Sequence, residues 1–318
     1  MKPIYDHLSL TWRIFMKNLQ FITFLWLIHS FSLTNICHAN PKIDLLNCAY
    51  SGDKSCVENA LSNSADINYR DPEGTSALSL AIEQGHDHIV KLLINRGADL
   101  EVEVYHDGKS PTPLMLALGT NACPKSKSLP IARMLINAGA DVKAKRDDGR
   151  TALMLAAALA DSATLKLLIS KGADINAQSK KGSTPLMDAS KKGNDETTKF
   201  LIENGAEINV KDYQKTTPLI SAVFYGGNIE VVKLLVENGA DIEARNITRA
   251  TPLHLACAVE EPKIEIVRYL IAKGADVNAC SPNFKGLHPL GAAMVNGYAE
   301  IKSVLLEAGA ELEWDCSD

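Results

Sequence analysis

The sequence predicts an all-α solenoid built from about eight helix, turn, helix and hairpin units. The first observation is a recurring Gly-Ala-Asp triplet or close variant, whose successive spacings are 33, 42, 33, 33, 34, 35 and 35 residues. A second motif, close to Thr-Pro-Leu, follows about ten residues after each triplet. Only 6% of the 318 residues are aromatic and 46% are hydrophobic, which favours packed helices over a β-sandwich or barrel. The triplets begin at Ser64, Gly97, Gly139, Gly172, Gly205, Gly239, Gly274 and Gly309.

Each unit is expected to start with a short helix at the second motif. Thr251 is a good N-cap because its hydroxyl accepts an orphan backbone N–H, and Pro252 suits the first helical position. A second helix is expected around residues 89–93, where apolar side chains recur at helical spacing, and it ends where Gly97 allows a positive φ. Residues 174–183 carry turn formers and predict an extended hairpin between units.

A unit of this size cannot bury its apolar face alone, so the units are expected to stack into one body. Stacking replaces the two domains that the length suggests, and the predicted solenoid runs over residues 40–318. The first unit is unusually polar and lacks the Thr-Pro-Leu motif, as an N-terminal cap would, and the acidic end of the last unit suits a C-terminal cap. The third unit carries extra residues, which are expected to form surface loops.

The period and the second motif together resemble the ankyrin repeat, whose signature is T-P-L-H-x-A. The resemblance covers about residues 42–312. It implies a non-catalytic module that binds a protein partner through its hairpin tips and the concave face of its first helices. It also implies a structural hydrogen-bonding role for His254. The copies of the motif begin at Ser76, Thr112, Thr151, Thr184, Thr217, Thr251 and His288.

Residues 1–39 are expected to form a secretory signal peptide. A basic start precedes the apolar run 19–28, and Cys37 and Ala39 supply small residues before the cleavage point. Cleavage would export the chain to the periplasm or the exterior, without stable membrane insertion. Met16 is the expected true start, because it gives a signal of conventional length. An uncleaved membrane anchor is the alternative, and polar residues within the segment disfavour it.

The sequence contains no recognised catalytic motif. It lacks the signatures of phosphate-binding loops, zinc proteases and nucleophile elbows, so we expect neither enzyme activity nor a cofactor. His86 and His88 are expected to be solvated on different sides of a helix. The formal net charge of -5 disfavours a general nucleic-acid binder. The alternatives are an exported enzyme or a membrane-anchored adaptor on the same scaffold.

Six cysteines remain after the predicted cleavage. Cys48 and Cys56 are expected in the two helices of the first unit, where a bridge would stabilise this cap by about 2 to 3 kcal/mol. Cys280 and Cys316 follow equivalent hairpins in neighbouring units and are a second candidate pair. The other interpretation makes Cys48, Cys56 and Cys257 small buried apolar residues, and the sequence leaves both open.

A partner-binding surface is predicted at the positions that vary most among ankyrin-like proteins, which are the hairpin tips and the ends of the first helices. Repeats five and six place aromatic rings beside cations there, as protein interfaces do. Solvated loop lysines are the alternative interpretation. Because these groups are basic, we expect them to meet an acidic face of the partner. We also expect the chain to be a monomer. The predicted residues are Lys180, Lys181, Lys191, Lys192, Tyr213, Lys215, Phe224, Tyr225, Arg245, Arg249, Phe284 and Lys285.

Overall fold

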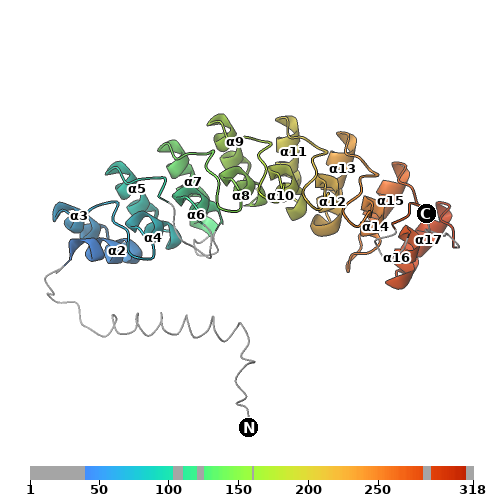
Figure 1. Cartoon of the computed structure of the whole chain (residues 1–318), viewed down its shortest axis with the longest axis horizontal. Coiled ribbons are helices and arrows are strands. Elements are labelled where there is room, and N and C mark those ends of the chain that lie inside the picture. Colours follow the sequence, from blue (N-terminus) through green and yellow to red (C-terminus); the bar gives the residue numbers. More distant parts are fainter. Residues whose placement is uncertain (1–39, 103–109, 120–124, 160, 282–287, 313–318) are drawn as a thin grey trace, which may run out of the picture. The chain divides into compact units, whose positions relative to one another are not determined.

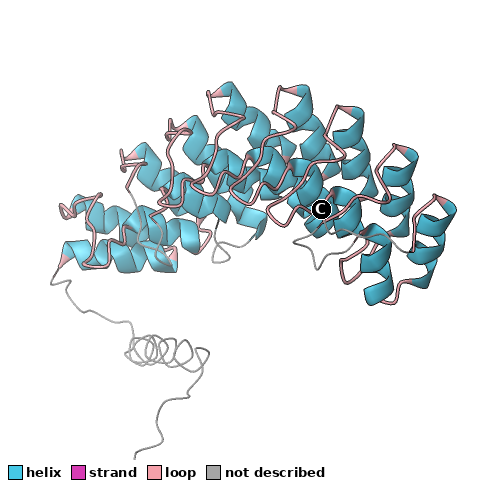
Figure 2. Ribbon diagram, turned by 45° about the vertical axis from the view of Figure 1, so that its right-hand side comes forward, coloured by secondary structure: helices cyan, strands magenta, loops and turns pink. Residues whose placement is uncertain are grey.

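The structure is a computed structural model that describes residues 40–102, 110–119, 125–159, 161–281 and 288–312. The predicted signal peptide lies outside these residues. The repeats lie in the unit Lys42–Asp318. Within the described part the chain forms helices and no strands (Figure 2), with two isolated antiparallel bridges at hairpins. The predicted all-α solenoid is confirmed.

Each repeat contributes two helices joined by a short turn, and the pairs follow one another in sequence order (Figure 1). First helices pack on the first helices of neighbouring repeats, and second helices pack on second helices. The pairs are α2 (Pro41–Ser51) and α3 (Lys54–Ser62), α4 (Ala77–Glu83) and α5 (Asp87–Asn95), α6 (Pro113–Gly119) and α7 (Lys125–Asn137), α8 (Ala152–Leu159) and α9 (Ser162–Ser170), α10 (Pro185–Lys192) and α11 (Asp195–Glu203), α12 (Pro218–Ser221) with η1 (Ala222–Gly226) and α13 (Ile229–Glu237), α14 (Pro252–Ala256) and α15 (Ile264–Ala272), and α16 (Pro289–Val295) and α17 (Ala299–Glu307).

The first helices start as the Thr-Pro-Leu motif predicts. The Thr184 hydroxyl accepts the backbone N–H of Met187 at 3.3 Å, and Thr251 and His254 cap each other reciprocally. His254 is fully buried, so its ring is part of the cap and is remote from solvent. In repeat eight His288 takes the place of threonine, and its Nδ1 accepts the N–H of Gly291 at 3.2 Å.

One hydrophobic cluster runs from Leu45 in α2 to Leu305 in α17. Each first helix after the first repeat contributes a buried alanine five residues after its cap position, and this small side chain lets neighbouring helices approach closely. The core therefore belongs to the stack as a whole and to no single repeat. These alanines are Ala81, Ala117, Ala156, Ala189, Ala222, Ala256 and Ala293.

A ladder of side-chain hydrogen bonds joins the repeats after their second helices. Asn176 accepts the backbone N–H of Glu207 at 2.9 Å and donates to the Gly205 carbonyl at 3.3 Å. The side-chain oxygens of Asn68, Asn209 and Asn278 each accept the equivalent backbone N–H from the next repeat. Glu101 and Glu243 replace asparagine at this position and accept in the same way. Burial is the main cause that raises the pKa of both glutamates.

The first repeat is closed by a disulfide between Cys48 in α2 and Cys56 in α3, whose Cα atoms lie 5.5 Å apart. Cys257 is a buried free thiol, and burial raises its pKa to about 12. Cys280 is also disulfide-bonded. Its predicted partner Cys316 lies outside the described residues, so that pairing stays a prediction.

His88 is exposed and His86 is half-buried, but the expectation that their rings point to different sides of a helix was wrong. Their rings meet edge to face with centroids 5.9 Å apart. The Nε2 atom of His86 donates to the Tyr50 carbonyl and that of His88 to the Gly52 carbonyl, each at 3.0 Å. Both can face the same way because His86 is the N-cap residue of α5 and not part of its regular turns. The two rings fasten repeat two to the turn of the N-terminal cap.

Reduction of the disulfide between Cys48 and Cys56 should destabilise the first repeat by about 2 to 3 kcal/mol, because the bridge closes a short loop in the unfolded chain. Hydrogen exchange with and without reductant should show faster exchange in α2 and α3 before any later helix. A double Cys48→Ala and Cys56→Ala variant should behave like the reduced chain. Equal loss of protection in all repeats would contradict this expectation.

The cap at His288 should make repeat eight sensitive to pH. Burial lowers the pKa of His288, so the folded chain favours the neutral ring, which can accept the Gly291 N–H. Stability from this cap is therefore present above the ordinary pKa of about 6.5 and is lost as the pH falls through the window below it. His288→Thr keeps a capping acceptor without a charge. Thermal unfolding at pH 7.5 and 5.5 should show the smaller pH effect in the variant, and an identical pH effect in both proteins would refute the assignment.

Candidate functional site

The hairpin tips of repeats four to seven are linked backbone to backbone. The N–H of Lys180 donates to the Asp148 carbonyl at 2.9 Å, and that of Tyr213 donates to the Lys181 carbonyl at 3.0 Å. The N–H of Ile247 donates to the Gln214 carbonyl at 2.8 Å. These bonds form a continuous ridge of tips. On it the side chains of Lys180 and Lys181 are exposed, and that of Tyr213 is 76% exposed.

Two predicted cations occupy a backbone conformation that favours glycine. Gly149 and Gly182 have φ values of +77° and +81° at their tips. At the matching tips of repeats six and seven stand Lys215 with φ 56° and Arg249 with φ 64°. A non-glycine residue in the left-handed region carries a steric cost of about 1 kcal/mol or more. Both cations are exposed, so packing does not explain why they stand there.

Aromatic and cationic groups also meet at the ends of the first helices in repeats five and six. The ammonium of Lys191, in the last turn of α10, lies 4.4 Å from the centre of the Tyr225 ring. Tyr225 in turn contacts Phe224 edge to face, with ring centroids 4.7 Å apart. Phe224 is 42% exposed and Tyr225 54%, and Lys192 is exposed beside them. The structure therefore brings these four predicted residues together.

A π-helical turn presents the two aromatic rings, and the sequence analysis missed it. In repeat six the left-handed Gly227 lies ten positions after the cap residue Thr217. In repeat five Gly193 lies nine positions after Thr184. The extra residue widens the helix, and the N–H of Gly227 reaches back five residues to a carbonyl at 2.9 Å. π-Turns of this kind are rare and are often found at functional sites. The spacing of 34 residues between Gly205 and Gly239 is the sequence signal for it.

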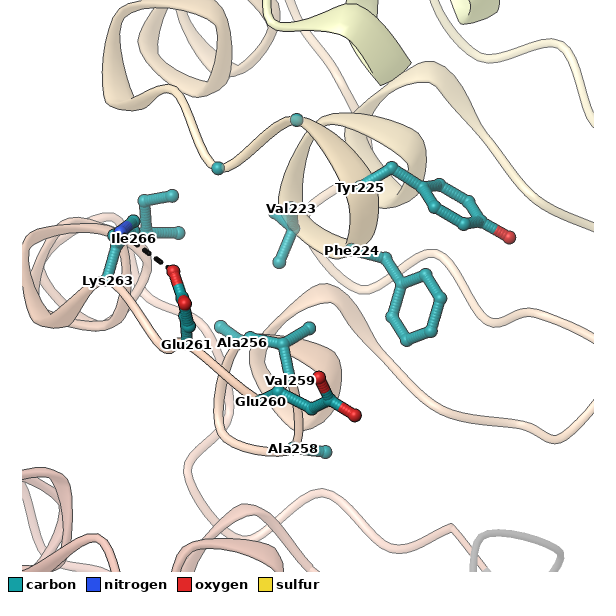
Figure 3. Close-up of a pocket in the computed structure, with 12 residues that line it drawn as sticks. Val223, Phe224, Tyr225, Ala256, Ala258, Val259, Glu260, Glu261, Lys263 and Ile266 are labelled. Atoms are coloured by element: carbon teal, nitrogen blue, oxygen red, sulfur yellow. Dashed lines mark ion pairs between the residues drawn. The ribbon is translucent and has the colours of Figure 1, made fainter.

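Repeat seven departs from the pattern at the same point. Its first helix ends without a glycine, and the chain continues through Val259, Glu260 and Glu261 to Lys263. Between this segment and η1 lies an open cavity of about 540 Å³ (Figure 3). Val223 and Phe224 point toward the repeat-seven segment, while Tyr225 points away from it.

Not every predicted cation is available to a partner. The guanidinium of Arg245 is half-buried and donates to the Cys280 carbonyl at 2.6 Å, so it holds the next repeat. Phe284 and Lys285 lie outside the described residues.

A half-buried ion pair lies beneath the same surface. Asp188 on α10 accepts from Arg150 at 2.8 Å, at a position where four other repeats carry leucine. Burial raises the pKa of Asp188, and the positive charge of Arg150 opposes that shift. The pair joins the tip of repeat four to the first helix of repeat five, and its charge is balanced within the chain.

Comparison with known proteins agrees with this geometry. A family model described as ankyrin repeats (3 copies) matches residues 45–146, 101–179, 119–212, 153–246 and 219–314. The chain belongs to the ankyrin-repeat family. Ankyrin repeats are a protein–protein interaction module, so the general class of function follows from the family.

Curated relatives match this ankyrin-repeat chain only over part of their own length. An ankyrin repeat-containing protein of Treponema pallidum (strain Nichols) is 35% identical over 100 residues, which are 31% of this chain and 30% of that protein. The mouse B-cell lymphoma 3 protein homolog is 34% identical over 100 residues, 31% of this chain and 20% of its own length. The human ankyrin repeat and SOCS box protein 6 is 30% identical over 122 residues, 38% of this chain and 27% of its own length. The similarity is thus one of repeats and does not extend to whole proteins.

Two further classes of site were considered in the described part of the ankyrin-repeat chain. No group of three or more His, Cys, Asp or Glu side chains there could hold a metal ion. None of the helices described is both long enough and apolar enough to cross a membrane. The tips, the aromatic pair and the cavity beside η1 are therefore the features that the candidate site comprises.

Gly226 should be required for the packing of η1. A Cβ atom at this position would lie 2.5 Å from the Ser190 carbonyl oxygen, so Gly226→Ala should push η1 away from α10 and destabilise the chain by about 1 to 3 kcal/mol. Gly119→Ala is the control, since its Cβ would meet only the flexible end of Leu155 at 3.1 Å. Chemical denaturation of both variants measures the difference. A loss for Gly226→Ala no greater than that of the control would show that the close approach is unimportant.

Proposed function

We propose that this ankyrin-repeat chain is a non-catalytic binding protein that recognises an acidic surface of a protein partner. The contact is a basic-aromatic face on repeats five to seven. The observation that carries the proposal is that three exposed aromatic rings stand beside cations on that face, one at a hairpin tip and two at the end of a first helix. The basic-aromatic face consists of Lys180, Lys181, Lys191, Lys192, Tyr213, Lys215, Phe224, Tyr225 and Arg249.

The two parts of this face are close enough to act together. The helix-end residue Lys191 lies in the last turn of α10, whose eight residues span about 12 Å, and the tip residue Lys181 lies four residues before the start of that helix. A partner segment of ordinary interface size covers that distance. Exposed aromatic rings beside cations are typical anchors, because they gain most from desolvation when a partner covers them.

The strained backbone of Lys215 and Arg249 supports the same conclusion. Glycine would relieve the left-handed strain at both tips, as it does in repeats four and five. A residue that keeps such strain while its side chain remains exposed suggests that the side chain is needed for recognition. The charges are well placed to attract an acidic partner before contact is made.

We also propose that the chain is exported and that residues 1–39 are removed. The disulfide between Cys48 and Cys56 supports this, because such bonds persist in oxidising compartments and are rare in the cytosol. An exported location suits a small cap that relies on a covalent closure.

Charge reversal at Lys180 and Lys181 should slow association with the partner and weaken its dependence on salt, because exposed cations mainly steer the encounter. Tyr213→Ala should instead raise the dissociation rate and weaken binding by about 2 kcal/mol if the ring is an anchor. Surface plasmon resonance at two salt concentrations separates the two effects.

The matched control for these variants is charge reversal at Lys91 and Lys171, exposed cations on α5 and at the end of α9. We expect it to leave association unchanged. If the control slows association as much as the tip variant does, the partner does not use the basic-aromatic face.

Processing of the signal should leave a mature chain that begins at Asn40 or within a few residues of it. N-terminal sequencing of protein collected outside the cytoplasm measures this. Recovery of the intact segment 19–28 in membranes would instead indicate an uncleaved anchor.

A further inference from the structure

We propose that the cavity between η1 and the repeat-seven turn receives an apolar anchor side chain of the partner, within an extended segment that is acidic on one side of the anchor and basic on the other. The acidic end lies over Lys191 and Lys192, and the basic end pairs with Glu260 and Glu261. This inference rests on the proposed function and specifies the chemistry of the partner segment.

The cavity is large enough to admit an apolar side chain. Its volume of about 540 Å³ lies within the range of ligand pockets in proteins. An apolar side chain that contacts the apolar part of the lining gains free energy by replacing water there. The lining combines apolar and charged side chains, which come from Val223, Phe224, Ala258, Val259, Glu260, Glu261, Lys263 and Ile266.

The cavity exists because two neighbouring repeats depart from the period at the same point. The π-turn in repeat six displaces Phe224 from the usual helical track, and repeat seven extends from Val259 to Lys263 where repeats one, two, five and eight turn at a left-handed glycine. The described first helices of the other repeats contain no π-turn. The cavity is therefore a feature of this chain and does not follow from the repeat pattern.

A contact from repeat eight fixes the backbone on the repeat-seven side of the cavity. The hydroxyl of Tyr298, the N-cap residue of α17, donates to the Val259 carbonyl at 2.8 Å and lies 3.1 Å from the Glu260 carbonyl. This contact crosses from repeat eight and fixes the backbone that carries Glu260 and Glu261. A pocket fixed before binding loses less entropy when it is occupied.

The charges on the two sides of the aromatic pair have opposite sign. On the repeat-five side Lys191 lies over the Tyr225 ring at 4.4 Å, with Lys192 exposed next to it. On the repeat-seven side Glu260 and Glu261 are exposed at the cavity, as Figure 3 shows. The carboxylate of Glu261 lies 4.0 Å from the ammonium of Lys263, and the Glu261 side chain is 90% exposed (Figure 3). Exposed ion pairs of this length are weak, so a guanidinium or ammonium group of the partner can replace Lys263.

A random heptapeptide library displayed on phage tests the inference with the full chain as target. The library is selected on the unmodified chain after depletion on Ala258→Phe, which fills the cavity. We expect enriched peptides to carry a large apolar residue with Asp or Glu on one side and Lys or Arg on the other. Their affinity should fall by about tenfold for Ala258→Phe. The matched control is Ala158→Phe in repeat four, because Ala158 follows Thr151 by the same seven residues as Ala258 follows Thr251.

Two further variants cover the case in which Ala258→Phe unfolds, which circular dichroism detects. Deletion of Gly227 shortens the first helix of repeat six to the length found in repeat five. This deletion should abolish selection of the apolar anchor. A double Glu260→Lys and Glu261→Lys variant changes only exposed residues and should select peptides without the basic end. The inference is overturned if no peptide is enriched, or if the enriched peptides lack separated charges. A partner that needs Lys180, Lys181 and Tyr213 but ignores these cavity variants would overturn the inference and leave the proposed function intact.

Discussion

The structure depends on one constraint, which is that no single repeat can bury its own apolar face. Every first helix must offer small residues such as Ala156 and Ala189 to the next repeat, and every repeat must arrive in register with the one before it. The asparagine ladder enforces this register with polar groups, because Asn176 binds both the N–H of Glu207 and the carbonyl of Gly205. Extra residues can therefore enter only where they leave both interfaces undisturbed.

The two kinds of insertion in the chain follow from that constraint. In repeat three some of the extra residues lengthen the second helix at its start, so that α7 has 13 residues where α5 and α9 have nine. In repeat six the single extra residue lies inside the first helix, whose buried Ala222 must stay in register. The helix accommodates it as a π-turn after that alanine, and the displacement appears on the exposed side as Phe224 and Tyr225. Packing thus converts a one-residue insertion into a surface feature.

The sequence was sufficient for whatever is local to one repeat. Thr251 and Pro252 predict the start of a helix, and the spacing of the glycines indicates the number of repeats. The sequence was insufficient where a side chain meets a group about 30 to 40 residues away. Arg245 was assigned to a partner but binds the Cys280 carbonyl, and the pairing of His86 with Tyr50 was not foreseen. For the candidate site, the aromatic residues and cations were predicted individually, whereas the cavity needs two irregular turns to lie face to face.

Stability and recognition use different parts of each repeat in this arrangement. Where a cation or acid is needed for packing, its charge is balanced within the chain, as Arg150 balances the half-buried Asp188. The exposed charges on the tips and helix ends lie on a backbone that the stack has already fixed, so a partner meets them with little loss of conformational entropy. The left-handed backbone of Lys215 and Arg249 fits the same division, because the stack supplies enough stability to hold strained tips. A rigid stack therefore allows residues to be chosen for binding at positions where folding alone would favour glycine.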